Sequence, residues 1–485
     1  MRALQGFSFA IAVSLACSSC GADSLNAAAD HLGVEDVATI RFDGTGANFS
    51  VGQPYVAGGE WPQVNIVSYD AVVDYQTPAM QIDMVREQPQ PEPMGGGVRF
   101  AGQQRQTQVV SGAAAWNQPP QAADGSQPDA QPQAPAVAAE RALQIWITPH
   151  GFVKAALANA ATVTETEEGG EVAFTLPSGH RVEGTINANG EVDRVRTWVD
   201  NPVLGVMLVE TTYSDYQEFE GVRFPTRIMQ SQGGRPALDL TIRTVTANAP
   251  VAIAVPASMA GFQPPAPTVT TTEVAPGVFY LTGGSHHSVA IEMSNGIVVV
   301  EGPQSEERGL AVIEAAKAAI PNKGITHVIN THVHFDHSSG LRPFVAEGAQ
   351  VVTHESAETF YRDAWSAPRT LRADRYATAN AEPAFITLAD TTTITDGRRR
   401  VEIHRIQESP HNTGFLMVWL PAERILIEAD AYTPAAAGAP VPPPNPNVIN
   451  LYDNVTRLGL QPRQILALHG PRVATLADLR AAAGR

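Results

Sequence analysis

Alternating apolar and polar residues run through most of the first half of the chain. They fill residues 36–84 and return as six short segments within residues 171–245, with Gly and Pro between them. This alternation predicts antiparallel β structure. Residues 140–157 instead follow a helical pattern. We therefore expect a mostly-β N-terminal domain over residues 36–255, in which a curved sheet wraps around one main helix.

Two stretches inside this domain, residues 86–97 and 117–138, are rich in Pro, Gln, Gly and Ala. Such composition cannot bury enough apolar surface to offset the entropy lost on ordering, so we interpret both as loops or disordered insertions. A third stretch, residues 256–267, is predicted to be a linker. A chain of 485 residues is long enough for two cores. We expect a second domain over residues 268–485, folding independently of the first.

Short strands and a helix alternate at the start of the second half, and an Asn-Gly pair at 295–296 supplies a hairpin turn. The pattern predicts strands at 278–281, 288–292 and 297–301, a helix at 305–319 and a strand at 326–330. This order of elements indicates an α/β domain.

The last of these strands leads directly into a run of metal-ligand residue types. His332, His334, Asp336 and His337 follow one another in the order H-x-H-x-D-H. Alternate residues at a strand end share a face, so the first two histidines can address one metal ion. After the chain turns, the aspartate and the third histidine can address a second ion. A surface loop that is merely rich in histidine explains this order less well.

Three further candidates follow later in the chain. They are His411 in Ser-Pro-His-Asn-Thr-Gly, Asp430 at the end of an apolar strand, and His469 after Ile-Leu-Ala-Leu. Taken singly, His411 could be a histidine in a turn, Asp430 could be a helix cap, and His469 could be the buried end of a strand. Their order in the chain after the first motif is what supports a role as metal ligands.

With these motifs, residues 272–485 resemble the metallo-β-lactamase superfamily. The resemblance implies an αββα sandwich whose centre binds two metal ions. It implies that His332, His334 and His411 hold the first ion, that Asp336, His337 and His469 hold the second, and that Asp430 bridges them. It also makes His332, His334 and Asp336 catalytic.

The chain departs from the family pattern at a few places. Pro410 and Ala429 stand where relatives usually carry glycine, and Glu301 stands where an aspartate commonly ends the early strand. The pair His286 and His287 lies in the early loop that faces the metals in the superfamily. We expect these two histidines to contact the substrate or to support the ligands, and a polar turn is the alternative.

A later segment is rich in arginine, with Arg362, Arg369, Arg372 and Arg375 on a predicted helix. These arginines could line the pocket and bind a carboxylate or phosphate of the substrate. We favour the alternative that they form a solvated helix face.

Charge and cysteine content narrow the chemistry. The net charge of -17 disfavours a nucleic-acid partner, because an acidic surface repels phosphate backbones. Cys17 and Cys20 are the only cysteines, so the folded part of the chain contains neither disulfides nor thiolate ligands. Nitrogen and oxygen ligands suit two catalytic zinc ions, and iron or manganese would also fit.

The first twenty residues are typical of an export signal. Arg2 precedes an apolar stretch, residues 7–16, and Cys20 follows small residues. The pattern resembles a bacterial lipoprotein signal, which implies a periplasmic protein whose only membrane contact is a lipid anchor at Cys20. Residues 213–227 are similar to a repeat of periplasmic lipoprotein-carrier domains, which implies a β half-barrel.

These observations favour an exported dinuclear zinc hydrolase. By resemblance, a metal-bridging hydroxide would cleave an acyl bond of a small molecule, such as an ester, thioester, lactam or lactone. One alternative is a phosphodiesterase on the same fold. Another is a non-catalytic metal-binding or carrier lipoprotein. The fold alone does not identify the substrate.

Overall fold

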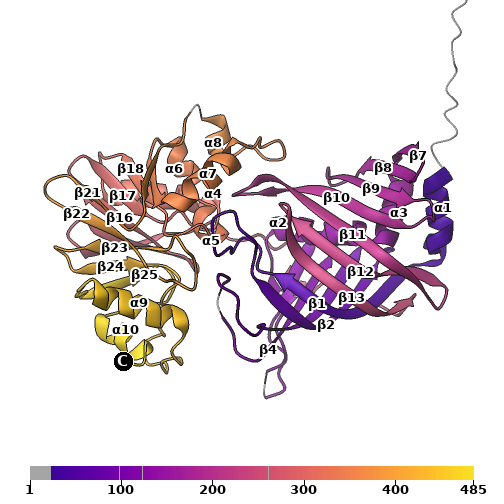
Figure 1. Ribbon diagram of the computed structural model, residues 1–485, viewed down its shortest axis with the longest axis horizontal. Coiled ribbons are helices and arrows are strands. Elements are labelled where there is room, and N and C mark those ends of the chain that lie inside the picture. Colours follow the sequence, from indigo (N-terminus) through magenta and orange to yellow (C-terminus); the bar gives the residue numbers. More distant parts are fainter. Residues whose placement is uncertain (1–22, 98, 123, 260, 380) are drawn as a thin grey trace, which may run out of the picture.

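The computed structural model describes residues 23–97, 99–122, 124–259, 261–379 and 381–485. Figure 1 shows two lobes side by side, one built from the first half of the chain and one from the second. The expected signal peptide, residues 1–20 with both cysteines, lies outside the described residues. Among the helices of the described ranges, none combines the length and the apolar character needed to cross a membrane.

In the described residues, the N-terminal lobe contains one thirteen-stranded antiparallel sheet. Its order is β6-β5-β4-β3-β2-β1-β13-β12-β11-β10-β9-β8-β7, so two meanders join where β1 pairs with β13. The strands are β1 (Thr39–Phe49), β2 (Gln63–Asp74), β3 (Ala79–Glu87), β4 (Gln103–Ser111), β5 (Ala114–Gln118), β6 (Gln131–Pro132), β7 (Thr162–Thr166), β8 (Gly169–Thr175), β9 (Arg181–Asn187), β10 (Val192–Asn201), β11 (Gly205–Phe219), β12 (Val222–Gln232) and β13 (Arg235–Ala247).

The alternation seen in the sequence places one face of this sheet against a shared core. In β10, for example, Val195, Thr197 and Val199 are buried while their neighbours are partly exposed. Among the residues that the structure describes, three helices pack on this face: α1 (Asp23–Leu32), α2 (Pro135–Trp146) and α3 (Pro149–Ala158). Leu32 and Phe152 are fully buried there. The prediction of a mostly-β domain is therefore confirmed.

Three details differ from the expectation for this lobe. The core begins before residue 36, because α1 contributes to it. The single helix expected at 140–157 is two helices, since Thr148 caps α3 and Pro149 starts it. Residues 117–138 are not all loop, because they include the end of β5, the short β6 and the first turn of α2. Most of residues 86–97 lies in the loop after β3.

The described part of the C-terminal lobe contains two sheets. The first has the order β14-β15-β16-β17-β18-β19-β20 and the second β21-β22-β23-β24-β25. The strands are β14 (Thr270–Ala275), β15 (Val278–Thr282), β16 (Ser288–Met293), β17 (Gly296–Val300), β18 (Ile325–Ile329), β19 (Gln350–His354), β20 (Phe385–Leu388), β21 (Thr391–Thr395), β22 (Arg400–Arg405), β23 (Leu416–Leu420), β24 (Ile425–Glu428) and β25 (Gln464–Ala467). The helices are α4 (Glu306–Ala319), α5 (Phe335–Ser338), α6 (Arg342–Ala346), α7 (Glu355–Ser366), α8 (Arg375–Thr378), α9 (Pro446–Arg457) and α10 (Leu476–Ala482).

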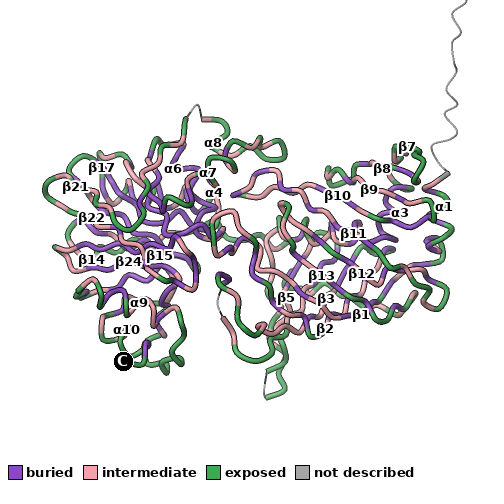
Figure 2. The backbone as a smooth tube through the Cα atoms, viewed as in Figure 1, coloured by how far each residue is buried: buried purple, intermediate pink, exposed green. Residues whose placement is uncertain are grey.

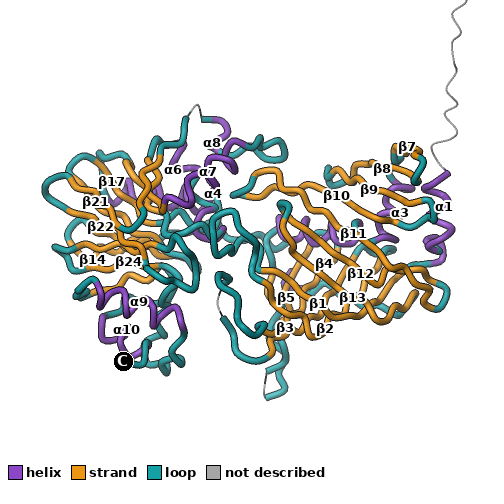
Figure 3. Tube along the Cα trace, in the orientation of Figure 1, coloured by secondary structure: helices purple, strands orange, loops and turns teal. Residues whose placement is uncertain are grey.

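Strand β17 explains the layering of this lobe. All five of its residues are buried, as expected for a strand covered on both faces. Val298 and Val300 belong to the core that includes the second sheet, whereas Val299 packs with Val312 of α4. The strands of both sheets are accordingly coloured largely as buried (Figure 2), and helices flank the sheets on the outside (Figure 3). This is the expected αββα sandwich.

Candidate metal centre

The H-x-H-x-D-H motif lies where the buried strand β18 ends. The chain passes His332 and His334 in a loop and then enters the one-turn helix α5, which contains Asp336 and His337. The rings of His332 and His334 lie 4.4 Å apart, centroid to centroid. The strand end and the short helix therefore turn four ligand-type side chains toward one place.

A first group of donor atoms comes from His332, His334, His411 and Asp430. One donor atom of each lies within 4.8 Å of all the others. His411 Nε2 is 3.1 Å from His332 Nε2 and 3.2 Å from Asp430 Oδ2. The three histidines are buried. The structure thus brings together all the residues expected around the first ion.

A second group comes from His286, Asp336, His337 and His469, again within 4.8 Å of one another. His469 Nε2 is 3.0 Å from His337 Nε2, and His286 Nε2 is 3.1 Å from Asp336 Oδ2. His286 thus contacts a ligand-type residue directly, which favours a supporting role over the alternative of a polar turn.

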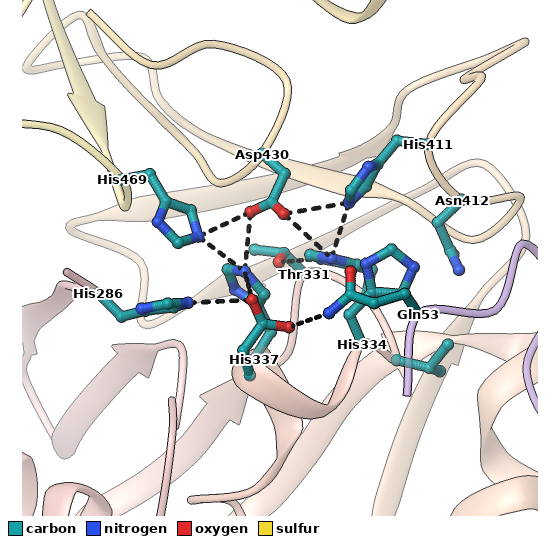
Figure 4. A network of polar contacts seen from close by, with 12 residues as sticks. Gln53, His286, Thr331, His334, His337, His411, Asn412, Asp430 and His469 are labelled. Carbon is teal, nitrogen blue, oxygen red and sulfur yellow. Dashed lines mark hydrogen bonds and ion pairs between the residues drawn. The ribbon is translucent and has the colours of Figure 1, made fainter. Parts of the chain in front are cut away.

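Asp430 lies between the two groups, with one carboxylate oxygen toward each (Figure 4). Its Oδ1 is 2.8 Å from His337 Nε2 and 3.0 Å from His469 Nε2. Its Oδ2 faces His411 and lies 4.0 Å from His332 Nε2. This division of one carboxylate between two histidine sets is the arrangement expected of a bridging ligand.

The donor atoms fit metal ions. Two ligands about 2.1 Å from a tetrahedral ion lie about 3.4 Å apart, close to the 3.0–3.2 Å found between paired donors here. His334 gives a second test, because its Nδ1 is buried without a hydrogen-bond partner in the described residues. Its Nε2 donates to the carbonyl of Pro54 (3.1 Å), which leaves the lone pair of Nδ1 for an ion. The His and Asp groups could therefore hold metal ions.

The electrostatics of the site prepare these side chains for ligation. Burial lowers the pKa of His332 well below its usual value and that of His334 to about 3, so both rings are neutral. Burial alone would raise the pKa of Asp430, but His337, His411 and His469 hold it well below its usual range. His332 and His334 therefore offer neutral imidazoles, and Asp430 offers an ionised carboxylate.

His337 has the opposite shift. Burial lowers its pKa, but this effect is outweighed by Asp430, Asp336 and Glu301, so the pKa rises well above the usual value. Without an ion, the ring therefore carries a proton among carboxylates. Binding of an ion at this histidine must release that proton, which couples metal affinity to pH.

Glu301 supports both groups and was noted in the sequence only as a departure from the family pattern. It is fully buried, and its Oε2 accepts from His337 Nδ1 (3.1 Å). The hydroxyl of Thr331 donates to the same carboxylate and stands 2.9 Å from His332 Nδ1. Asn330 Nδ2 donates to Oε1 (3.0 Å). The carboxylate thus orients one histidine of each group, directly or through Thr331.

His287 is held differently from its neighbour His286. Its Nε2 donates to the carbonyl of Gly470 (2.9 Å), and its Nδ1 accepts from the backbone N–H of Gly283 (3.3 Å). It borders the cavity described next but has both ring nitrogens engaged with backbone. We assign it to the support of the early loop.

A cavity of about 710 Å³ opens over the two groups. Asp336, His411, Asp430 and His469 form part of its wall. Among the described residues that line it there is neither a lysine nor an arginine. Apart from the two aspartates and three histidines, the wall consists of uncharged residues, several of them glycine.

The arginine-rich segment does not reach this cavity, and it is not one helix. Arg362 lies in α7, Arg375 in α8, and Arg369 and Arg372 in the stretch between them. Each pairs elsewhere with a carboxylate or a backbone carbonyl. The structure therefore gives these arginines no contact with the candidate site.

Residues of the N-terminal lobe also belong to the site, which sequence reasoning missed. Besides accepting from His334, the Pro54 carbonyl accepts from Asn412 Nδ2 (3.0 Å). Gln53 borders the cavity and donates to Asp336 (2.8 Å). Their segment has no motif, and only the tertiary structure brings it to histidines some 280 residues later. The expectation that the two halves fold independently stays a prediction.

Residues 281–449 match the family model of the Metallo-beta-lactamase superfamily. The C-terminal domain belongs to that superfamily. The matched segment includes the motif at 332–337, His411 and Asp430, while His469 lies beyond its end.

Individual proteins are similar to part of this chain. The 2,4-dinitroanisole O-demethylase subunit alpha of Nocardioides sp. (strain JS1661) is 30% identical over 166 residues, which cover 34% of this chain and 46% of that protein. The chain thus matches about half the length of this curated relative. A metallo-beta-lactamase from Pontibacter korlensis is 16% identical, with 45% of this chain and 98% of that chain covered and a TM-score of 0.35. The DIM-1 metallo-beta-lactamase exposed to ceftazidime is 14% identical, with coverages of 46% and 97% and a TM-score of 0.36.

Proposed function

We propose that this protein is a dinuclear metallohydrolase that cleaves an acyl bond of an uncharged small molecule. The observation that carries the proposal is Asp430, whose two oxygens each face a separate set of histidines. Membership of the C-terminal domain in the superfamily supports a metal-dependent hydrolase or a related enzyme. We further propose zinc as the metal, because nitrogen and oxygen ligands suit catalytic zinc, with iron and manganese as the alternatives.

The residues would share the work as follows. The first ion would be held by His332, His334 and His411, the second by Asp336, His337 and His469, and Asp430 would contact both. When bound, two such ions supply an activated water and positive charge beside the developing oxyanion. Asp336 stays ionised because His337 and His286 hold its pKa below the usual range against the effect of burial. Its two oxygens accept from His286 and Gln53, which fixes the carboxylate at the edge of the cavity.

The cavity wall favours an acyl bond over a phosphodiester. Enzymes that bind phosphate groups commonly use Arg or Lys for recognition. The described lining residues include neither, so an anionic group of a substrate would find no Lys or Arg in the wall to pair with its charge. Neutral esters, thioesters and lactones need no such cation. The lack of a cationic side chain also argues against a lactam antibiotic that carries a carboxylate.

A second candidate function is cleavage of an activated aryl ether. The named relative is an O-demethylase subunit for 2,4-dinitroanisole, and it shares 30% identity over 166 residues with this chain. That substrate is uncharged, in keeping with the lining of the cavity. Water would replace the methoxy group on the ring carbon and release methanol, so no redox partner is needed.

The test is a substrate panel on the full-length protein loaded with zinc, iron or manganese. The panel contains p-nitrophenyl esters, a thioester, a lactone, nitrocefin, bis-p-nitrophenyl phosphate and 2,4-dinitroanisole. We expect turnover of an ester, thioester or lactone that is lost in Asp430→Ala and retained in the control His180→Gln, whose residue lies in the turn before β9 of the N-terminal lobe. Faster turnover of the phosphodiester or of 2,4-dinitroanisole would identify the corresponding alternative. No turnover with two ions bound would favour a non-catalytic metal-binding lipoprotein.

A further inference from the structure

The segment that joins β1 to β2 reaches out of the N-terminal lobe and docks on the metal centre. Its backbone is fixed at both ends of the contact. Gly52 O accepts from the N–H of Phe335, at the start of α5, at 3.0 Å. Tyr55 O accepts from the N–H of Thr413, two residues after His411, at 2.9 Å. The segment thus contacts both of the loops that carry the three histidines of the first group.

Gly52 makes this close approach possible. It has a positive φ of 79°, and a Cβ atom added there would lie 2.5 Å from the ring of Phe335. Residues with a side chain are disfavoured by the backbone conformation and excluded by the contact. The next residue, Gln53, is therefore carried to a fixed position beside Asp336.

The amide of Gln53 has a defined orientation in this position. Its Nε2 donates to Asp336 Oδ1 at 2.8 Å, and a carboxylate offers only acceptors, so the NH₂ side must face it. The carbonyl oxygen Oε1 then points away from Asp336. It is buried and has no hydrogen-bond partner among the described residues, and Gln53 borders the cavity. An unpaired buried acceptor is unfavourable, and a donor on a bound ligand would satisfy it.

The charge of the surroundings selects the kind of donor. Asp336 is already engaged by Gln53 and His286, and bound metal ions would add positive charge to this part of the wall. A cationic ammonium would be repelled by those ions. A neutral N–H or O–H group meets no such penalty.

We propose that Gln53 is a substrate-binding residue that the N-terminal domain contributes to the active site. Its Oε1 accepts a hydrogen bond from a neutral N–H or O–H group next to the bond that is cleaved. The substrate class is thereby narrowed to uncharged acyl compounds with such a donor, for example hydroxy esters or N–H amides. The proposal rests on the proposed function, because the substrate meets Gln53 only if the metal centre is the reaction site.

A pair of metal-binding probes tests the contact without requiring turnover. Benzohydroxamate carries an N–H beside its chelating oxygens, and N-methylbenzohydroxamate lacks it. Their dissociation constants are measured by calorimetry on the zinc-loaded full-length protein, on Gln53→Leu and on the control Gln63→Leu, which changes an exposed glutamine of the same domain. Metal content is measured on each preparation.

We expect the wild type and Gln63→Leu to prefer benzohydroxamate about five-fold over the methylated probe, the factor that corresponds to one neutral hydrogen bond. Gln53→Leu should bind both probes equally while retaining its metal. A general loss of structure would weaken both probes together and would leave their ratio unchanged. The role of Gln53 would be overturned if wild type and Gln53→Leu preferred benzohydroxamate over the methylated probe by the same factor. It would also be overturned if wild type bound both probes equally. Failure of both probes to bind wild type that contains two zinc ions would show that the ions are closed to ligands, which would overturn this proposal and the proposed function together.

Discussion

Replacing Glu301 with Gln should weaken the binding of both metal ions at once. The carboxylate is fully buried and receives only donors: His337 Nδ1, the hydroxyl and backbone N–H of Thr331, and Asn330 Nδ2. Glutamine has nearly the same shape but brings an NH₂ group of its own. In either orientation, that group faces a donor. Glu301→Gln therefore places two hydrogen-bond donors against each other next to the metal ligands. Most isosteric substitutions would have a small effect on metal affinity, but this one should not.

The size of the effect follows from the two chains of contacts that begin at Glu301. One reaches His337 directly, and the other reaches His332 through Thr331. Loss of such a supporting carboxylate typically lowers metal affinity by about 10- to 100-fold, or about 1.4–2.8 kcal/mol. Because one histidine of each group is affected, we expect a loss in this range for both ions. The unsatisfied contact should also lower the free energy of unfolding of the metal-free protein by about 1–3 kcal/mol.

Competition against a chromogenic chelator measures the two affinities, and urea unfolding of the metal-free protein measures the stability. The matched control is Glu292→Gln, which removes a partly exposed carboxylate paired with Lys323 at 2.8 Å. It should leave both affinities unchanged. Wild-type affinity for both ions in Glu301→Gln would refute the reasoning. Loss at the second ion alone would show that the contact through Thr331 does not support His332.

Metal analysis of the saturated protein should give two ions per chain, and Asp430→Ala should lose tight binding of at least one, because its carboxylate faces both groups. Burial lowers the pKa of His150 to about 4 from 6.5, so the folded state binds fewer protons than the unfolded chain between these values. The free energy of unfolding should therefore fall by about 2 kcal/mol between pH 7 and pH 5 because of His150. Urea unfolding should show that His150→Gln lacks this part of the decrease. The same decrease in wild type and His150→Gln would contradict the low pKa of His150. Mass spectrometry of the protein from its native host should find a lipid-modified Cys20 as the first residue; an intact Met1 would contradict export.

The sequence was sufficient where the information is local. The alternation of residues in a strand such as β10 predicts which face is buried, and the spacing of His332, His334, Asp336 and His337 predicts a ligand cluster at a strand end. Distant ligands could be added only through the order of motifs typical of a family.

Contacts between distant segments could not be predicted in this way. Glu301 follows an apolar strand, and its donors are chosen by packing rather than by spacing. Gln53 and Pro54 stand in a loop without any motif, and their role depends on how one lobe lies against the other. Pro149 marks the break between α2 and α3, but the helical pattern of residues 140–157 continues across it and so predicts one helix.

The glycine at position 52 has a consequence for how this protein can be recombined. The Phe335 ring occupies the space that any side chain at Gly52 would need, although 283 positions separate the two residues. A chimera cut at the linker, 256–267, would exchange one half of this fitted pair and keep the other. A graft that moves residues 50–62 together with the C-terminal domain should therefore keep the contacts of Gln53 and Pro54 at the metal centre, whereas a graft cut at the linker should lose them.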